Sequence, residues 1–268
     1  MLSLLAGVML AAAAPAAAAT PAPAPTPTLP PLECPEISRA IEQMMRQDAR
    51  LRDWPQLARY RADNAALPPP AAGESRVVFM GDSITDNWPR HAPFFPGKPY
   101  VNRGISGQTT PQMLIRFRPD VIALQPKAVL LLAGTNDIGG NTGPMSNEEI
   151  EANLASMADL AAAHGIRVIL AGILPIHDLR PAAPGDTQPR MSARRPPARI
   201  NAVNEWMKRF AAEKDHVYLD YAPALADESG ALRKELSEDG LHPNAKGYDL
   251  MAPLAEKAIV EALAPVRR

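Results

Sequence analysis

The chain has 268 residues, 46% of them hydrophobic, and a formal net charge of -1, which is typical of a globular protein of one or two domains. A nucleic-acid-binding domain normally carries a basic excess, so the near-neutral charge argues against that class. The single cysteine, Cys34, excludes an intramolecular disulfide framework and a multi-cysteine metal cluster.

The first 35 residues have a composition of their own. Residues 1–19 pass from an apolar segment into a run of small residues that ends at Ala19, which is typical of a secretory signal peptide. The apolar segment is shorter than the roughly 20 residues that a membrane-spanning helix needs. We therefore expect a secreted or periplasmic protein with no stable membrane anchor, and a low-complexity tail is the alternative interpretation of residues 1–19.

A linker rich in Pro and Ala is expected at residues 20–35, because such a sequence adopts extended polyproline II structure and cannot form a core. Cys34 lies at its end. A lipid anchor is disfavoured there because Leu32 and Glu33, rather than small residues, precede the cysteine. An unpaired surface or linker thiol is the expected state of Cys34.

Residues 36–70 are predicted to be an N-terminal helical extension ahead of a main domain at residues 71–268. Ile37, Ile41 and Met44 recur at helical spacing, which predicts a helix with one buried face. Trp54-Pro55 interrupts the pattern, so two helices are expected. The apolar face is compatible with packing on the main domain or against another subunit, and the sequence does not indicate the oligomeric state.

Short apolar strands then alternate with helices. The strands are expected at residues 76–80, 100–105, 128–133, 167–174 and 217–221. The helices are expected after the second strand up to about residue 124, and at residues 148–164, 199–214 and 243–264, the last with Pro243 in its first turn. This alternation predicts an α/β fold with a parallel sheet covered on both faces. In such sheets, functional residues gather at the carboxyl ends of the strands.

Residues 175–198 interrupt the alternation with six prolines and four arginines. The arginines are Arg180, Arg190, Arg194 and Arg195. One interpretation is that they hold an anionic substrate such as an acidic sugar, and the other is that they lie on a solvated loop.

Polar residues follow the first three strands. Ser83 stands where the first strand meets a helix, so its hydroxyl is either a nucleophile or only a helix cap. Gly104, after the second strand, can bring its backbone N–H close to a ligand, and Asn136, after the third, offers an amide donor; each also suits a simple turn.

Asp239 and His242 lie three residues apart just before the last helix. A histidine that acts as a base needs a carboxylate at one ring nitrogen to fix its tautomer and stabilise its positive charge. Together with the residues at the strand ends, this pair supplies a nucleophile, a base, a carboxylate and hydrogen-bond donors at one edge of the predicted sheet.

These motifs resemble those of the GDSL-type, or SGNH, hydrolases. Four blocks occur in the family's order between residues 76 and 264: Gly-Asp-Ser-Ile at 81–84, the block around Gly104, Gly-Thr-Asn-Asp at 134–137 and Asp-Gly-Leu-His-Pro at 239–243. Ile84 replaces the family's usual leucine. Residues 53–60 and 81–88 are similar to a secreted bacterial branch that resembles platelet-activating-factor acetylhydrolase subunits and carbohydrate acetylesterases.

The resemblance implies a flavodoxin-like three-layer α/β/α sandwich with a five-stranded parallel sheet. It implies Ser83 as nucleophile, His242 as general base and acid, and Asp239 as the carboxylate behind His242. The oxyanion hole would consist of the backbone N–H groups of Ser83 and Gly104 and the Asn136 side chain. It implies no metal and no cofactor.

The expected function is therefore hydrolysis of short-chain, chiefly acetyl, carboxylic esters of small molecules or carbohydrates. The low aromatic content, 5%, and the lack of a long apolar lid favour small acyl groups. Two alternatives remain open: an acyltransferase that uses the same triad, and a non-catalytic binding module that retains the fold.

Overall fold

The computed structural model describes residues 35–178 and 190–265. The predicted signal peptide, the predicted linker up to Cys34, and Arg180 lie outside the described residues. The chain divides between Arg46 and Gln47 into two compact units, and the second unit carries the whole sheet. None of the helices in the described ranges is both long enough and apolar enough to cross a membrane.

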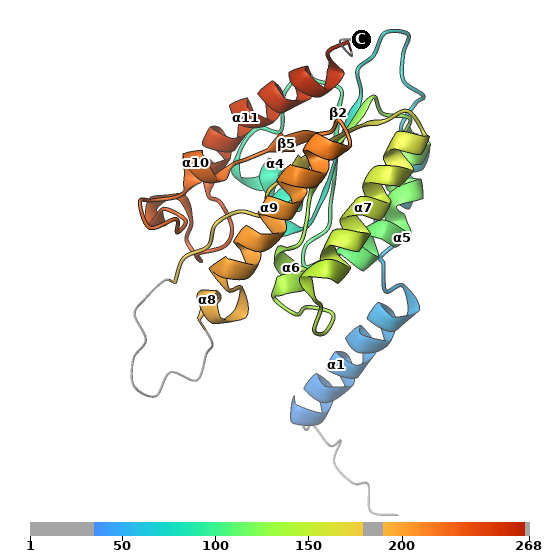
Figure 1. The fold of residues 1–268 in the computed structure, drawn as a ribbon. Coiled ribbons are helices and arrows are strands. Elements are labelled where there is room, and N and C mark those ends of the chain that lie inside the picture. Colours follow the sequence, from blue (N-terminus) through green and yellow to red (C-terminus); the bar gives the residue numbers. More distant parts are fainter. Residues whose placement is uncertain (1–34, 179–189, 266–268) are drawn as a thin grey trace, which may run out of the picture. The chain divides into compact units, whose positions relative to one another are not determined.

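The strands and helices follow the predicted alternation (Figure 1). The strands are β1 (Val77–Gly81), β2 (Tyr100–Gly104), β3 (Ala128–Leu132), β4 (Arg167–Ala171) and β5 (Val217–Leu219). The α-helices are α1 (Pro35–Arg52), α2 (Arg61–Ala66), α3 (Ser83–Asp86), α4 (Trp88–His91), α5 (Thr110–Asp120), α6 (Thr135–Ile138), α7 (Asn147–Ala163), α8 (Met191–Arg194), α9 (Pro197–Glu213), α10 (Ala222–Leu225) and α11 (Ala245–Leu263). Two 3-10 turns, η1 (Ile122–Leu124) and η2 (Lys234–Leu236), complete the described elements.

The five strands form one parallel sheet in the order β2-β1-β3-β4-β5. This order is that of the flavodoxin-like doubly wound fold, so the predicted fold is confirmed. The order reverses between β1 and β3, and ligands of such sheets bind beyond the carboxyl ends of the strands at that point. Ser83 follows β1 and Asn136 follows β3, so both lie beside this crevice.

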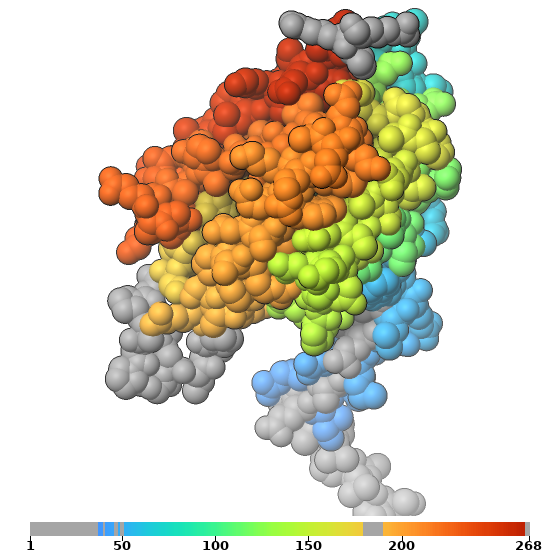
Figure 2. All heavy atoms as spheres, in the orientation of Figure 1, coloured from blue at the N-terminus to red at the C-terminus, as the bar shows by residue number. Residues whose placement is uncertain are grey.

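The sheet is buried on both faces, which explains why its strands are continuous apolar runs. Side chains of one face, such as Val78, pack with α5, α7 and α9, and those of the other face, such as Phe79, pack with α4, α10 and α11. Helices α7 and α9 contact each other as well as β4, and Figure 2 shows their atoms side by side on this side of the molecule. This packing makes the sheet a rigid support for the loops at its carboxyl edge.

The N-terminal helices are present as predicted, and the interruption falls at residues 53–60. The described apolar side chains at the start of the first helix are exposed in the single chain, so the buried face expected there, against the main domain or another subunit, stays a prediction. Ile41 is 51% exposed and Met44 is 68% exposed. The second compact unit begins at Gln47, well before the boundary expected at residue 71, and residues 53–66 bond directly to the main domain.

Two element boundaries differ from the predictions for local reasons. Strand β4 ends at Ala171 because the Asn204 side chain accepts from the Ile173 N–H and donates to the Ile173 carbonyl, in place of a strand partner. Helix α11 begins at Ala245, because the Asn244 side chain caps it by accepting from the Gly247 N–H. Pro243 therefore lies outside the helix.

Candidate active site

Ser83 is the first residue of α3, at a tight turn after β1. The helix cap is the neighbouring Asp82, whose side chain accepts from the Ile84 N–H at 2.9 Å. A Cβ at Gly81 would lie 2.2 Å from Thr85 Oγ1, so the turn requires glycine there. The hydroxyl of Ser83 is not used for capping and remains available for chemistry.

The side chains of Ser83, His242 and Asp239 form a continuous hydrogen-bonded chain. Ser83 Oγ lies 2.8 Å from His242 Nε2, and His242 Nδ1 lies 2.5 Å from Asp239 Oδ2. The other carboxylate oxygen of Asp239 accepts the backbone N–H groups of Leu241 and His242. Burial raises the pKa of Asp239, but the hydrogen bonds from the His242 ring and the two backbone groups outweigh it and lower the pKa to about 2. The carboxylate therefore stays ionised behind the imidazole.

The loop that carries Asp239 and His242 rests on the chain that leaves β4. The His177 N–H donates to the Gly240 carbonyl at 2.9 Å. Gly240 has a φ of +82°, and a Cβ there would lie 2.2 Å from the His177 carbonyl oxygen, so only glycine fits. This contact fixes the loop from behind.

Asn136 lies in α6, directly after β3, and is buried. Its Nδ2 donates one hydrogen bond to the Gln108 carbonyl at 3.1 Å, which leaves its second N–H for a ligand. Its Oδ1 accepts from Asn141 Nδ2 at 3.0 Å and from Arg195 Nη2 at 3.4 Å. The two donors fix which end of the amide is nitrogen, so the orientation suits a donor of an oxyanion hole.

The prediction that the Gly104 N–H is an oxyanion donor is wrong. That N–H donates to Asn102 Oδ1 at 2.9 Å. Gly104 is needed instead for packing, since a Cβ there would lie 2.1 Å from the Asp86 backbone nitrogen. Three residues later, the N–H of Gly107 has no hydrogen-bond acceptor among the described residues, and the Gly107 carbonyl accepts from Asn141, which also bonds Asn136. Gly107 is thus the better candidate donor.

Arg195 has a role that neither interpretation of its segment foresaw. Its side chain is buried, and its Nε donates to the Thr135 carbonyl at 3.0 Å and to Thr135 Oγ1 at 3.1 Å. With its bond to Asn136, it braces the turn after β3. Arg190 and Arg194 are exposed, and part of the segment forms helix α8. Burial lowers the pKa of Arg195, as does the charge of Arg194, but an arginine remains protonated.

A second buried arginine braces the other two strand ends. Arg116, on α5, donates to the Gly81 and Arg103 carbonyls and pairs with Asp120 at 3.1 Å. Tyr60, from the N-terminal extension, donates its hydroxyl to the Gly104 carbonyl. Sequence reasoning missed both residues, because a single polar residue within a helical segment gives no signal of its partners.

Two buried carboxylates, those of Asp82 and Asp137, lie in the turns that follow β1 and β3. Burial raises the pKa of Asp82 to about 6, against the opposing hydrogen bond from Ile84. Burial also raises the pKa of Asp137, whose Oδ1 accepts hydrogen bonds from the backbone N–H and the hydroxyl of Thr110.

Across residues 35–178 and 190–265, no group of three or more His, Cys, Asp or Glu side chains is arranged to hold a metal ion.

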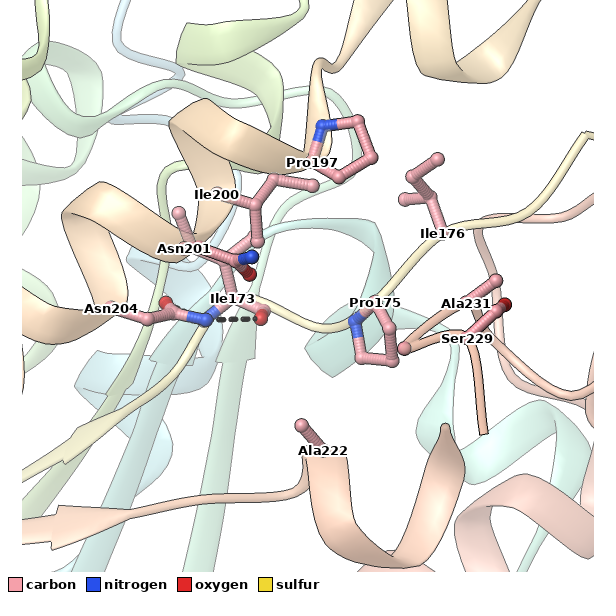
Figure 3. Close-up of a pocket in the computed structure, with 11 residues that line it drawn as sticks. Ile173, Pro175, Ile176, Pro197, Ile200, Asn201, Asn204, Ala222, Ser229 and Ala231 are labelled. Atoms are coloured by element: carbon pink, nitrogen blue, oxygen red, sulfur yellow. Dashed lines mark hydrogen bonds between the residues drawn. The ribbon is translucent and has the colours of Figure 1, made fainter. Parts of the chain in front are cut away.

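A small cavity lies beyond the end of β4 (Figure 3). Pro175 and Ile176 lie on one side of it and Ile200 of α9 on the other, where Asn204 bonds Ile173. Its volume is about 120 Å³, below the roughly 300 Å³ at which small-molecule sites begin. We interpret it as imperfect packing rather than a ligand site.

Comparisons with known proteins agree with this geometry. The model of the GDSL-like Lipase/Acylhydrolase family matches residues 79–250. The structure of a GDSL-like lipase from Bacteroides thetaiotaomicron is 40% identical, with a TM-score of 0.71, and the match covers 78% of this chain and 99% of that one. An acetylxylan esterase, Axe2 from Geobacillus stearothermophilus, shares the fold at 24% identity and a TM-score of 0.55, over 69% of this chain and 94% of that one.

Esterase TesA of Pseudomonas aeruginosa is 29% identical over 145 residues, which is 53% of this chain and 60% of that protein. A second curated relative matches over 32% of its length. The chain thus spans less than two thirds of the length of the curated relatives that it matches.

Proposed function

Because the chain belongs to the GDSL-like lipase/acylhydrolase family, we propose that it is a serine esterase that hydrolyses short-chain esters, acetyl esters above all, through Ser83, His242 and Asp239. The observation that carries the proposal is the unbroken hydrogen-bonded chain from Ser83 Oγ through the His242 ring to Asp239. A serine is a weak nucleophile unless a positioned base takes its proton, and this arrangement supplies one.

In the first half of the reaction, His242 Nε2 accepts the Ser83 proton as Oγ attacks the ester carbonyl. The Nδ1–H of His242 donates to Asp239, which holds the ring in the required tautomer and stabilises its positive charge. As the tetrahedral intermediate collapses, His242 gives its proton to the leaving alcohol. In the second half, water gives a proton to His242 as it attacks the acyl carbon. When this second tetrahedral intermediate collapses, the bond from the acyl carbon to Ser83 Oγ breaks, His242 returns the proton to Oγ, and the acid is released.

The oxyanion would be stabilised by three donors: the Ser83 N–H, the Gly107 N–H and Asn136 Nδ2. Donors that are already fixed need not reorganise as the charge develops, which is why they lower the barrier more than water does. The bonds from Arg195 and Asn141 to Asn136 Oδ1 supply this rigidity.

The surroundings of Ser83 support a small acyl group. Next to Asp82, the residue before Ser83, the side chains of Ile84, Leu132 and Ile173 pack with essentially no free volume. A long acyl chain would need an apolar channel in which to be buried. The acetylxylan esterase that shares this fold makes acetylated carbohydrates natural substrates to test.

The test is hydrolysis of p-nitrophenyl esters from acetyl to dodecanoyl by the wild type and by Ser83→Ala. Ser156→Ala, which removes an exposed hydroxyl from α7, is the matched control. We expect rapid cleavage of the shortest esters, loss of at least about 10⁴-fold in kcat for Ser83→Ala, and no change for the control. No cleavage of any ester by the wild type would refute the esterase. Suppression of free acid by a sugar acceptor would instead reveal the acyltransferase, and inertness with retained sugar binding would favour the binding module.

The proposed location is outside the cytoplasm, in the periplasm or medium. It rests on the composition of residues 1–19. Expression of the full chain should yield an exported protein shortened near Ala19, and mass spectrometry of its N-terminus tests this. A full-length N-terminus in the cytoplasmic fraction would refute the proposal.

A further inference from the structure

A second, larger cavity lies beside the oxyanion hole. It encloses about 390 Å³, within the range of roughly 300–1,000 Å³ typical of small-molecule sites. Trp54 and Gln56 line one side, and Ser106, Asn141 and Thr142 line the other. The catalytic mechanism uses none of these five side chains directly.

The wall formed by residues 53–56 is a built part of the domain. Gln112 Nε2 donates to the Trp54 carbonyl at 2.7 Å, and Gln108 Nε2 donates to the Pro55 carbonyl at 2.8 Å. Asp53 caps the same segment by accepting the N–H groups of residues 57 and 58. Since both glutamines are buried, the segment is held through its backbone while the Trp54 side chain remains 37% exposed.

Asn141 connects this cavity to the catalytic centre. Its Nδ2 donates both to the Gly107 carbonyl and to Asn136 Oδ1, each at 3.0 Å. Gly107 itself lines the cavity. Through Gly107 and Asn141 the cavity therefore adjoins two of the residues proposed to bind the ester carbonyl.

The lining suits a neutral, polyhydroxylated ligand. Hydroxyls and amides both donate and accept hydrogen bonds, as sugar hydroxyls require. An exposed indole offers a flat apolar surface against which the C–H face of a sugar ring packs. The lining holds no Lys or Arg, and its only charged group is the Asp53 carboxylate, which disfavours anionic ligands. Apart from Trp54 it offers no large apolar side chain, which disfavours a fatty chain.

We propose that this cavity is a sugar-binding subsite that holds a neutral sugar ring of the alcohol portion of the ester, with Trp54 and Gln56 as its specificity-determining residues. The inference rests on the proposed esterase function and names the substrate class of the same site. It also assigns a function to the N-terminal extension, which forms one wall of the subsite.

The variants Trp54→Ala and Gln56→Asn test this subsite on two substrates, acetylated xylotriose and p-nitrophenyl acetate. Asparagine is chosen because Gln56 has a φ of +57°, which asparagine tolerates. Leu57→Ala is the matched control, since Leu57 is exposed on the same segment and does not line the cavity. We expect Trp54→Ala to raise KM for acetylated xylotriose about tenfold, with kcat/KM for p-nitrophenyl acetate changed less than twofold. The control should match the wild type on both substrates.

Equal losses on both substrates, or no loss on either, would overturn the subsite. A direct binding measurement separates this failure from failure of the esterase. Ser83→Ala is titrated with unacetylated xylotriose while tryptophan fluorescence is monitored, and Ser83→Ala/Trp54→Ala serves as its control. Saturable binding that depends on Trp54 supports the subsite even if no ester is cleaved. Absence of binding in a protein whose parent cleaves p-nitrophenyl acetate refutes the subsite alone.

Discussion

Replacing Arg195 with methionine should lower kcat only because the Asn136 side chain is then held less firmly. Arg195 bonds Asn136 Oδ1 at 3.4 Å, and methionine retains most of its length without the guanidinium. Two of the oxygen atoms that accept hydrogen bonds from Arg195 keep another donor in the variant. Asn136 Oδ1 keeps its bond from Asn141, and the Thr135 carbonyl keeps its bond from the Gly139 N–H. The domain should therefore fold normally.

The size of the effect follows from these bonds. One lost hydrogen bond of this kind is worth about 0.5–1.5 kcal/mol, which corresponds to roughly a 2- to 12-fold loss in kcat if all of it is expressed in the transition state. Asn136→Ala removes a donor itself and should cost about 10²–10³ in kcat, with little change in KM. The Arg195→Met effect must be the smaller of the two, because Asn136 remains and is still held by Asn141.

The assay is a double-mutant cycle on p-nitrophenyl acetate, with Arg194→Met as control because Arg194 is exposed. In the Asn136→Ala background, Arg195→Met should have no further effect on kcat, since the group that it positions is absent. The same loss in both backgrounds would refute the reasoning and show that Arg195 acts independently of Asn136. A loss of kcat/KM that is seen only with anionic esters would instead indicate that Arg195 binds the substrate anion.

Three further predictions concern stability. Arg116→Met should destabilise the domain by about 3–5 kcal/mol, because it removes the ion-pair partner of the buried Asp120, which keeps only its hydrogen bond from Asn64. Arg118→Met, at an exposed position on the same helix, should not destabilise the domain; urea unfolding compares the two variants, and equal midpoints would contradict this. Burial raises the pKa of Asp82 from its ordinary value of 3.8 to about 6 in the folded protein. The ionised carboxylate therefore lowers the stability of the fold, and this loss of stability grows as the pH rises from about 4 to 6 and is complete above about pH 6. Asp82→Asn should raise Tm at pH 8 more than at pH 4, and a uniform shift would refute this. The pKa of Asp239 is lowered to about 2, so its contribution is complete above about pH 4 and is lost as the pH falls toward 2; Asp239→Asn should flatten the dependence of Tm on pH in that interval, and an unchanged slope would exclude Asp239 as its cause.

The elements that sequence reasoning predicted well are those with local signals. The strands are continuous apolar runs because both faces of the sheet are covered, and β1, β2 and β3 fall within two residues of their predicted positions. Ser83 and Asn136 were identifiable because each follows such a run directly. Asp239 and His242 are three residues apart and meet within one loop. In each case a short stretch of chain contains the whole signal.

Contacts between distant segments were not predicted. Arg195 and Thr135 are 60 residues apart, and Tyr60 and Gly104 are 44 apart. No local pattern distinguishes such a buried, bonded side chain from one that is solvated or that binds a substrate anion, so the sequence does not predict the bonds of Arg195 to Thr135 and Asn136. Gly104 and Gly107 also offer similar local signals, and only the bond from Gly104 to Asn102 shows which N–H is taken.

By itself, then, the sequence determined the fold class and the order of the elements, because both depend on periodicity, and it placed Ser83 and Asn136 at strand ends. The roles proposed for the triad come from the motifs shared with the family. The tertiary structure decided that the Gly104 N–H is taken by Asn102, that two buried arginines brace the strand ends, and that residues 53–56 form one wall of a cavity beside Gly107. These features arise only when distant segments pack together, since burial and competing hydrogen bonds determine which polar groups remain free.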